Sequence, residues 1–402
     1  MKRLLALLLA PGLAGAATVS PWTLPAPLGS AQPQLSTAPG GDLLLSWIER
    51  REAGGHRLRF ARSTGPAAWT PVRTIAEGDD WFVNWADVPA LQALADGSLW
   101  AHTLVKNGDA TYAYDVRLQV SRDGGAHWRA LGAVHDDGTP TEHGFATLWP
   151  QSADTVGIAW LDGRNSAGAG AGHDEHAGHG GAMTLRAARF GADDRKSGDA
   201  QVDAMTCDCC QTDTAVGDRG VLLAYRDRAE GEIRDIQVTR YDGTAWSEPV
   251  RVHADQWSMP ACPVNGPAIA ARGPEAWVAW YTGAGDAPSV RIAHSVDGGA
   301  RFGDMRQVAV GEAQQGRVDL AADAGGVWMS WLQEAGGAQS LWLARFSPGL
   351  DAEHFRVKVA DVAGRGRGTG FPRMQLRDGQ AWLAWTEVVD GQPRLRGARV
   401  RP

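Results

Sequence analysis

The sequence predicts an all-β chain folded as a seven-bladed β-propeller. Seven times along 402 residues an apolar run ends in an aromatic residue or a histidine, and the ends of successive runs are 55, 58, 65, 55, 51 and 54 positions apart. A period near 50 residues, with two-residue alternation inside each repeat, is typical of propeller blades. The 51 Gly and 18 Trp, frequent turn signals and scarcity of helical periodicity agree with this fold class.

Three strands are expected in every repeat. The first, innermost strand precedes the apolar run, at Pro33–Ser36, Pro89–Ala93, Gly144–Trp149, Thr212–Val216, Pro267–Ala271, Arg317–Ala321 and Pro372–Leu376. The apolar run itself is the second strand, at Leu43–Trp47, Ser98–His102, Val156–Trp160, Val221–Tyr225, Ala276–Trp280, Val327–Trp331 and Ala381–Trp385. The third strand alternates Arg or Leu with small residues, at Leu58–Ser63, Val116–Ser121, Thr184–Phe190, Ile233–Arg240, Val290–Ser295, Leu341–Phe346 and Arg394–Val400.

A fourth, outer strand is expected in five repeats, at Trp69–Ile75, Trp128–Val134, Trp246–Val252, Met305–Val310 and Phe355–Val359. The last repeat ends at Pro402, which leaves no room for its own outer strand. The segment Ser20–Leu28 is similar to Trp69–Ile75. We therefore expect the N-terminal segment to complete the last blade, which would close the ring and remove an exposed sheet edge.

The first residues predict export. Lys2 and Arg3 precede the apolar run Leu4–Leu13, and Ala14-Gly15-Ala16 supplies small residues for cleavage. This is the pattern of a signal peptide over residues 1–16, so we expect a periplasmic or secreted chain whose residues 18–402 form one domain. No apolar run reaches the roughly 18 residues that a membrane span needs, and we expect a monomer without membrane insertion.

The charge balance argues against nucleic acid as a partner. The formal net charge is -7, and removal of Lys2 and Arg3 would make it -9. Phosphate backbones are bound by clustered positive charge, which this composition does not supply. Partners of the predicted channel face are therefore sought among small ligands, glycans and proteins.

Two turns carry a recognisable motif. Residues 121–128 (SRDGGAHW) and 295–302 (SVDGGARF) both fit Ser-x-Asp-x-Gly-x-x-Trp/Phe, each directly after a third strand. The motif resembles the Asp-box, or bacterial neuraminidase repeat, of the sialidase superfamily. We expect a structural role for both copies, in which Asp caps the turn, Gly takes a positive φ and the aromatic side chain packs beneath.

The resemblance implies a sialidase-like propeller, with six blades as the alternative number, and a set of site residues. Sialidases use three arginines on the substrate carboxylate, a Tyr–Glu nucleophile pair and an Asp acid/base. The first-blade segment Gln32–Leu35 has no arginine where the superfamily places its first one. Tyr225 and Tyr281 are the tyrosines expected near strand ends of the channel face, and no Tyr–Glu pair is evident.

The weak catalytic candidates in this chain are the arginines and aspartates near strand ends on that face. Arg226, Arg317 and Arg373 are the possible anion clamps, and Asp213 or Asp227 is the possible acid. Bidentate arginines are what orient a carboxylate substrate. Exo-α-sialidase, another glycoside hydrolase and a glycan-binding propeller are the functions that these residues would serve.

All four cysteines lie in two loops that lead into inner strands. Cys207, Cys209 and Cys210 precede the fourth inner strand, and Cys262 precedes the fifth. Cys207 and Cys262 each stand 18 positions before the end of the following apolar run, so we expect one cluster beside the channel mouth. The segments CDCCQT, YRDR and CPVNGP resemble those of exported sialidase-like proteins of proteobacteria, which implies export and fold only.

The cysteines allow three kinds of chemistry. In an exported protein they can form disulfides, either Cys207–Cys210 with Cys209–Cys262 or Cys207–Cys262 with one local pair. A bond between the adjacent Cys209 and Cys210 would be strained. Two or more thiolates can instead ligate a soft metal, with Cu(I) favoured and Zn second, or the cluster can carry redox chemistry.

A histidine-bearing loop of the third repeat projects from the same face. Residues 167–183 contain His173, His176 and His179 beside two carboxylates and a methionine. Such a tract is typical of metal collection, and an irregular Gly/Ala-rich loop with incidental histidines is the alternative.

Three functions follow from these observations. The first is a non-catalytic propeller that binds copper, zinc or a partner through its cysteines, with the histidine tract as an accessory ligand set. The second is a glycoside hydrolase or glycan-binding propeller. The third is a protein-interaction scaffold stapled by disulfides.

Overall fold

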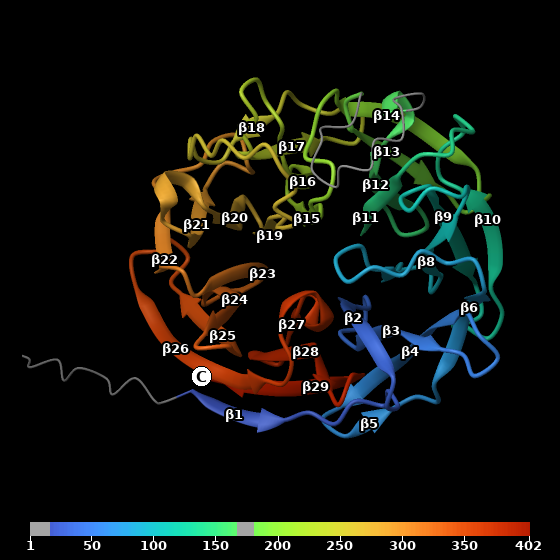
Figure 1. Cartoon of the computed structure of the whole chain (residues 1–402), viewed down its shortest axis with the longest axis horizontal. Coiled ribbons are helices and arrows are strands. Elements are labelled where there is room, and N and C mark those ends of the chain that lie inside the picture. Colours follow the sequence, from blue (N-terminus) through green and yellow to red (C-terminus); the bar gives the residue numbers. More distant parts are fainter. Residues whose placement is uncertain (1–16, 167–180) are drawn as a thin grey trace, which may run out of the picture.

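The chain forms a ring of seven β-sheets around a common axis (Figure 1). The computed structural model describes residues 17–166 and 181–402. Each sheet is a blade whose strands run antiparallel from the axis to the rim. The prediction of an all-β, seven-bladed propeller is confirmed, and the six-bladed alternative is wrong.

The first four blades follow the sequence in order. Blade 1 holds β2 (Ser30–Thr37), β3 (Leu43–Arg50), β4 (His56–Gly65), β5 (Ala68–Trp69) and β6 (Arg73–Gly78). Blade 2 holds β7 (Leu91–Ala93), β8 (Leu99–Lys106), β9 (Tyr114–Ser121) and β10 (Arg129–Ala133). Blade 3 holds β11 (His143–Pro150), β12 (Val156–Asp162), β13 (Thr184–Phe190) and β14 (Lys196–Asp203). Blade 4 holds β15 (Asp213–Gly217), β16 (Gly220–Arg226), β17 (Ile236–Tyr241) and β18 (Val250–Arg251).

The remaining blades complete the ring. Blade 5 holds β19 (Ala268–Arg272), β20 (Glu275–Thr282), β21 (Ser289–Ser295) and β22 (Arg306–Val310). Blade 6 holds β23 (Gln314–Asp323), β24 (Gly326–Ala335), β25 (Ala338–Phe346) and β26 (Glu353–Val362). Blade 7 holds β27 (Arg373–Arg377), β28 (Gln380–Val389), β29 (Gln392–Arg401) and β1 (Thr18–Pro21). Three short 3-10 turns, at Arg164–Ser166 (η1), Ala284–Asp286 (η2) and Gly366–Thr369 (η3), are the helical elements of the described residues.

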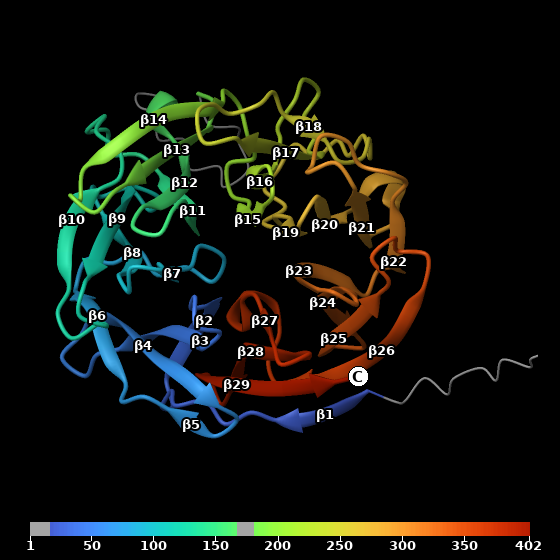
Figure 2. The ribbon, with the colours of Figure 1, turned by 180° about the vertical axis from the view of Figure 1, so that it is seen from behind.

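The last blade is closed by the N-terminal strand. Strand β1 pairs antiparallel with β29, with Val19 opposite Val400, and the two strands lie side by side in both views of the ring (Figures 1 and 2). The predicted closure is confirmed, but the predicted span Ser20–Leu28 is wrong. Pro21, Pro25 and Pro27 have no N–H to donate to a ladder, so the strand ends at Pro21.

Two outer strands also differ from the prediction. The expected strand Trp69–Ile75 is split into β5 and β6, because Pro71 interrupts the ladder between them. Strand β14 was not predicted, since its sequence, KSGDAQVD, has no apolar alternation. The strand forms because β13, which has seven residues, offers a free edge with which it pairs.

Both motif turns have the expected structural role. Ser121 Oγ donates to Asp123 Oδ1 at 2.8 Å, and that carboxylate oxygen accepts the N–H groups of Ala126 and His127 at 2.9 Å. Gly125 has φ +86° and donates its N–H to Ser121 Oγ. The second copy repeats the arrangement around Asp297, with the Arg301 N–H at 2.9 Å. Each carboxylate therefore satisfies backbone donors of its own turn.

The core lies between neighbouring blades, where second strands are buried on both faces. Trp47, Trp160, Trp280 and Trp331, at the ends of predicted apolar runs, are at most 1% exposed. Large aromatic side chains filling these wedges explain why the repeat places them at the same point of most blades. No helix of the described residues is long and apolar enough to cross a membrane.

Candidate functional site

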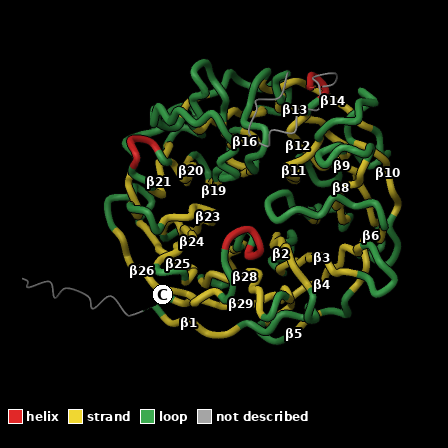
Figure 3. The backbone as a smooth tube through the Cα atoms, in the orientation of Figure 1, coloured by secondary structure: helices red, strands yellow, loops and turns green. Residues whose placement is uncertain are grey.

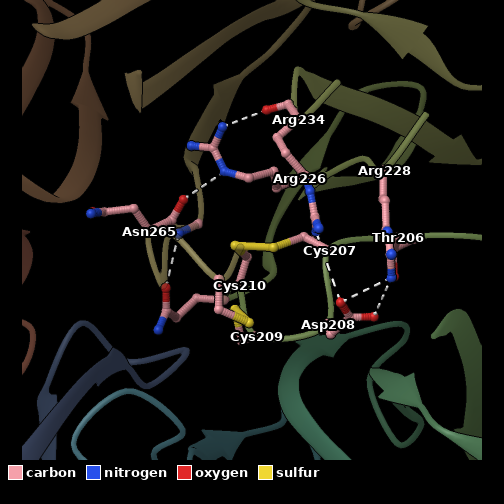
Figure 4. Close-up of a disulfide and its surroundings, with 12 residues drawn as sticks. Thr206, Cys207, Asp208, Cys209, Cys210, Arg226, Arg228, Arg234 and Asn265 are labelled. Carbon is pink, nitrogen blue, oxygen red and sulfur yellow. Dashed lines mark hydrogen bonds and ion pairs between the residues drawn. A yellow bond between two sulfur atoms is a disulfide. The ribbon is translucent and has the colours of Figure 1, made fainter. Parts of the chain in front are cut away.

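The cysteines meet beside the axis, as the sequence predicts. Cys207 is bonded to Cys210 and Cys209 to Cys262, which is one of the two pairings that the spacing left open (Figure 4). The bridge to Cys262 joins the loops that lead into blades 4 and 5. The sulfur atoms of Cys207, Cys209 and Cys210 all lie within 4.8 Å of one another. One cluster therefore contains all four residues.

A disulfide sulfur is a poor metal ligand, because the thiolate is the ligating form. Soft-metal binding by these cysteines therefore stays a prediction that applies to the reduced chain. The three histidines His173, His176 and His179 lie outside the described residues.

The three candidate arginines do not share one position. The guanidinium of Arg226 donates to three backbone carbonyls, those of Asn265 at 2.9 Å, Arg234 at 2.6 Å and Tyr281 at 2.7 Å (Figure 4). It also lies 5.0 Å from the Trp257 ring centre. Burial lowers the Arg226 pKa to about 10. These bonds give Arg226 a role in joining the loops of blades 4 and 5.

Arg317 and Arg373 approach the same aromatic ring. Arg317 lies 5.8 Å and Arg373 5.9 Å from the Phe371 ring centre. Arg317 also donates to Thr369 Oγ1 at 3.0 Å and to the Gly370 carbonyl at 2.9 Å, which fixes the short turn η3. This turn lies near the centre of the ring (Figure 3). The anion-clamp role of Arg317 and Arg373 stays a prediction.

Asp213 ties neighbouring blades together at the channel wall. Its Oδ2 accepts the Ile269 N–H at 2.8 Å, and Asp319 accepts the Met374 N–H at 2.6 Å in the same way two blades further on. Burial and the neighbouring Asp319 raise the Asp213 pKa to about 7, while Arg373 opposes the rise. Asp213 is thus a carboxyl that holds its proton to nearly neutral pH.

Asp227 follows β16 on the channel face. Its carboxylate accepts the Arg228 N–H at 2.7 Å and the Gln237 side-chain amide at 3.2 Å. Burial raises its pKa. Arg228 in turn contacts Asp208, which stands between Cys207 and Cys209 in the chain (Figure 4).

A second acidic group was missed by the sequence reasoning. The Tyr114 hydroxyl lies 2.8 Å from Asp87 Oδ2 and 3.0 Å from Glu142 Oε1. The expectation that no Tyr–Glu pair is present is therefore wrong. Asp87 precedes β7, Tyr114 begins β9 and Glu142 precedes β11, so all three come from the same face of the ring. That shared face is the available signal, whereas the tyrosines expected there from the sequence are Tyr225 and Tyr281.

The geometry of this group fixes the position of a proton. A phenol has one hydrogen to donate, so it cannot donate to both carboxyls. Burial raises the pKa of Asp87 to about 6 and that of Glu142 to about 8, where the charges of Asp87 and Asp208 add to the effect. Near pH 7 a protonated Glu142 therefore donates to Tyr114, which donates to an ionised Asp87.

A polar cavity of about 150 Å³ lies at the axis beside Asp87. Its lining includes Gln34, Gln211, Asp213 and Arg373. Asp87 Oδ1, Gln34 Oε1 and Arg373 Nε are buried and have no hydrogen-bond partner among the described residues. Buried polar atoms are nearly always paired, so the cavity needs water or a polar ligand to satisfy them.

Gln211 is a buried residue of the cavity lining. Its Nε2 donates to the Ala86 carbonyl at 2.9 Å, and its Oε1 accepts the Gly266 N–H at 2.9 Å. One side chain thereby joins the loops that lead into blades 2, 4 and 5. It also connects the disulfide loop with the residue before Asp87.

A buried histidine pair lies next to the acidic group. The rings of His135 and His143 stack with centres 3.5 Å apart and planes inclined by 2°. His135 contacts Asp115 at 3.1 Å and Asp137 at 2.9 Å. Imidazole lone pairs lie in the ring plane, so two parallel rings cannot both point at one metal ion. The pair is part of an ion-pair network between blades 2 and 3.

Comparison with known proteins shows the fold. No family model matches the chain, and no curated protein matches it in sequence. A protein of unknown function from Dyadobacter fermentans DSM 18053 has 14% identity and a TM-score of 0.53, covering 96% of this chain and 99% of its own. The polysaccharide lyase Uly1 has 10% identity and a TM-score of 0.54, covering 92% and 90%.

A sialidase is also among the similar structures. The Hadza microbial sialidase Hz136 has 16% identity and a TM-score of 0.43, covering 75% of this chain and 63% of its own. At such identities the likeness concerns fold alone.

Proposed function

We propose that this chain is an exported, carbohydrate-active propeller that binds a saccharide in the cavity beside Asp87. The observation that carries the proposal is the hydrogen-bonded series Glu142–Tyr114–Asp87, which ends at a polar cavity. The unpaired Asp87 Oδ1, Gln34 Oε1 and Arg373 Nε match the donors and acceptors of sugar hydroxyl groups.

Asp87 acts as the proton-transfer residue in this proposal. With a pKa of about 6 it is ionised near pH 7, and its partner Tyr114 already donates to the other carboxylate oxygen. A general base is most effective when its pKa lies near the working pH. A proton taken up at Asp87 is balanced along the series, because Glu142, the half-buried member, can release one to solvent.

Two reaction classes come into consideration for a carboxyl beside a saccharide cavity. Hydrolysis by two carboxylates that flank the scissile bond needs them about 5 Å or more apart with the substrate between. Here Tyr114 fills the space between Asp87 and Glu142, which disfavours that arrangement. Proton abstraction followed by β-elimination needs one base, and the fold is shared with the polysaccharide lyase Uly1.

The test is a panel of neutral and anionic polysaccharides and oligosaccharides. Binding is measured by calorimetry, and products are examined for new reducing ends and for the ultraviolet absorbance of unsaturated uronic acids, which only elimination produces. We expect Asp87→Asn to abolish turnover and Tyr114→Phe to reduce it by about 10²-fold or more. Asp286→Asn, at an exposed turn, is the matched control. No binding to any saccharide, or equal activity in Asp87→Asn, would overturn the proposal.

Soft-metal binding is the second candidate function, supported by the three sulfur atoms within 4.8 Å of one another. After reduction under anaerobic conditions we expect about one Cu(I) or Zn²⁺ per chain, and less in Cys209→Ser. If the protein is isolated with both disulfides formed and takes up no metal even after reduction, the bridges have a structural role only. The chain would then fit the third reading, a scaffold for a protein partner.

A further inference from the structure

We propose that the two disulfides form a thiol–disulfide exchange site for an external dithiol, with Cys262 as the sulfur that is attacked. This inference is independent of saccharide and metal binding. Its first basis is exposure. Cys262 is exposed and Cys209 half-buried, whereas Cys207 is 0% and Cys210 2% exposed. An external thiolate can therefore reach the Cys209–Cys262 bridge and not the inner one.

The second basis is the position of the leaving sulfur. Attack on Cys262 forms a mixed disulfide and releases Cys209 as a thiolate. That sulfur lies within 4.8 Å of both Cys207 and Cys210, which are already bonded to each other. A thiolate so close to a disulfide needs only a local movement of its own loop to attack it.

The product of this internal exchange follows from chain geometry. Adjacent Cα atoms are about 3.8 Å apart, which is shorter than disulfides usually span. Cys209 therefore attacks Cys207 rather than its neighbour Cys210. A Cys207–Cys209 bond forms, the Cys207–Cys210 bond breaks, and Cys210 leaves as the thiolate, which takes a proton from water.

The external reaction balances in electrons. The second thiol of the dithiol attacks the mixed disulfide, forms a disulfide within the partner and releases Cys262 as a thiol. Two electrons pass from the partner to the chain. The internal exchange does not change the number of electrons that the chain holds. The partner is a dithiol protein or peptide of the Cys-x-x-Cys kind, because a nearby second thiol is needed for release.

Reduction would free a defined segment. Among the described residues no hydrogen bond joins residues 260–263 to the rest of the chain, so the bridge at Cys262 is their main tie. The segment leads directly to Asn265, which binds Arg226, and to Gly266, which binds Gln211. Reduction of the bridge would therefore free the segment next to the bonds that Arg226 and Gln211 make.

The experiment is stepwise reduction of the folded protein with dithiothreitol, alkylation and peptide mass spectrometry. We expect the first two labels on Cys262 and on either Cys209 or Cys210. First labels on Cys207 and Cys210, with Cys262 still bridged, would overturn the assignment of the attacked bridge. Simultaneous labelling of all four would do the same.

Cys262→Ser tests the internal step, since it leaves Cys209 without its partner. We expect label on both Cys209 and Cys210; label on Cys209 alone would contradict exchange. The double variant Cys209→Ser/Cys262→Ser is the control, because it retains only the buried bridge and should take no label without denaturant. Circular dichroism confirms that each variant is folded. The stepwise reduction of the wild-type protein tests the proposal even if a variant fails to fold.

Discussion

The hydroxyl of Tyr114 and the carboxyl of Glu142 are 28 positions apart in the chain and 3.0 Å apart in the fold. They belong to different blades and are brought together because both lie at strand ends on one face of the ring. The same hydroxyl also reaches Asp87 at 2.8 Å. A single phenol thereby connects the solvent side of the site with the cavity.

The phenol should control the titration of Asp87. Its hydrogen bond lowers the Asp87 pKa against the opposing effect of burial. Tyr114→Phe is therefore expected to raise that pKa above about 6. Tyr112→Phe is the matched control, since Tyr112 is 48% exposed. The measurement is the carbon-13 shift of the Asp87 carboxyl against pH, and an unchanged midpoint would show that the bond is absent in solution.

Asp213 should make the protein less stable as the pH rises. Its pKa is raised from 3.8 to about 7, so in this interval the folded chain holds a proton that the unfolded chain has lost. Stability is then fully present below about pH 4 and is lost toward pH 7. Asp213→Asn, which keeps an acceptor for the Ile269 N–H, should remove a loss on the order of 4 kcal/mol.

Urea denaturation at several pH values measures this difference. Asp286→Asn, at an exposed turn, is the control and should leave the pH dependence unchanged. If the free energy of unfolding changes equally with pH in the wild type and in Asp213→Asn, the raised pKa of Asp213 is contradicted.

Closure of the ring should depend on Trp22. This side chain is 2% exposed, stacks on Trp69 with ring centres 5.2 Å apart and meets Trp382 edge-on at 4.9 Å. Trp22→Ala is expected to cost about 3–5 kcal/mol of unfolding free energy. Deletion of residues 18–28 should cost more, since it also removes the outer strand of blade 7. Leu28→Ala, at a side chain 70% exposed, is the control in thermal and urea melts.

A generic fluorogenic sialoside should not be cleaved. Sialidases orient the substrate carboxylate with three arginines. In this chain the Arg226 guanidinium donates to three backbone carbonyls. The segment Gln32–Leu35 contains no arginine. Release of sialic acid that disappears in Arg317→Ala or Arg373→Ala would contradict this and favour the sialidase alternative.

The blade repeat was predictable because its signal is local. Every second strand is an apolar run that must be buried on both faces, and its last side chain, such as Trp160 at 0% exposure, fills the wedge between blades. Strand β14 carried no such signal. Its side chains are all exposed or half-buried, so its position is set by pairing with β13 rather than by its own sequence.

The site was predictable only in part for the same reason. The cysteines share a rare residue type and a fixed distance from the following strand, so their convergence could be inferred. Asp87, Tyr114 and Glu142 are common residue types, and the segments around them contain no sequence motif. Their contact depends on the relative placement of blades 2 and 3, which spacing alone does not specify.

The pairing of residues 18–21 with residues 398–401 has a consequence for the order of folding. Most neighbouring strands of one blade are close in the chain, so each sheet can form from local contacts soon after its residues are available. The last blade instead requires segments from opposite ends of the chain to meet. This pairing has the highest sequence separation in the fold. Ring closure should therefore be the slow, late step of folding, and a protease that clips either segment would open the same blade.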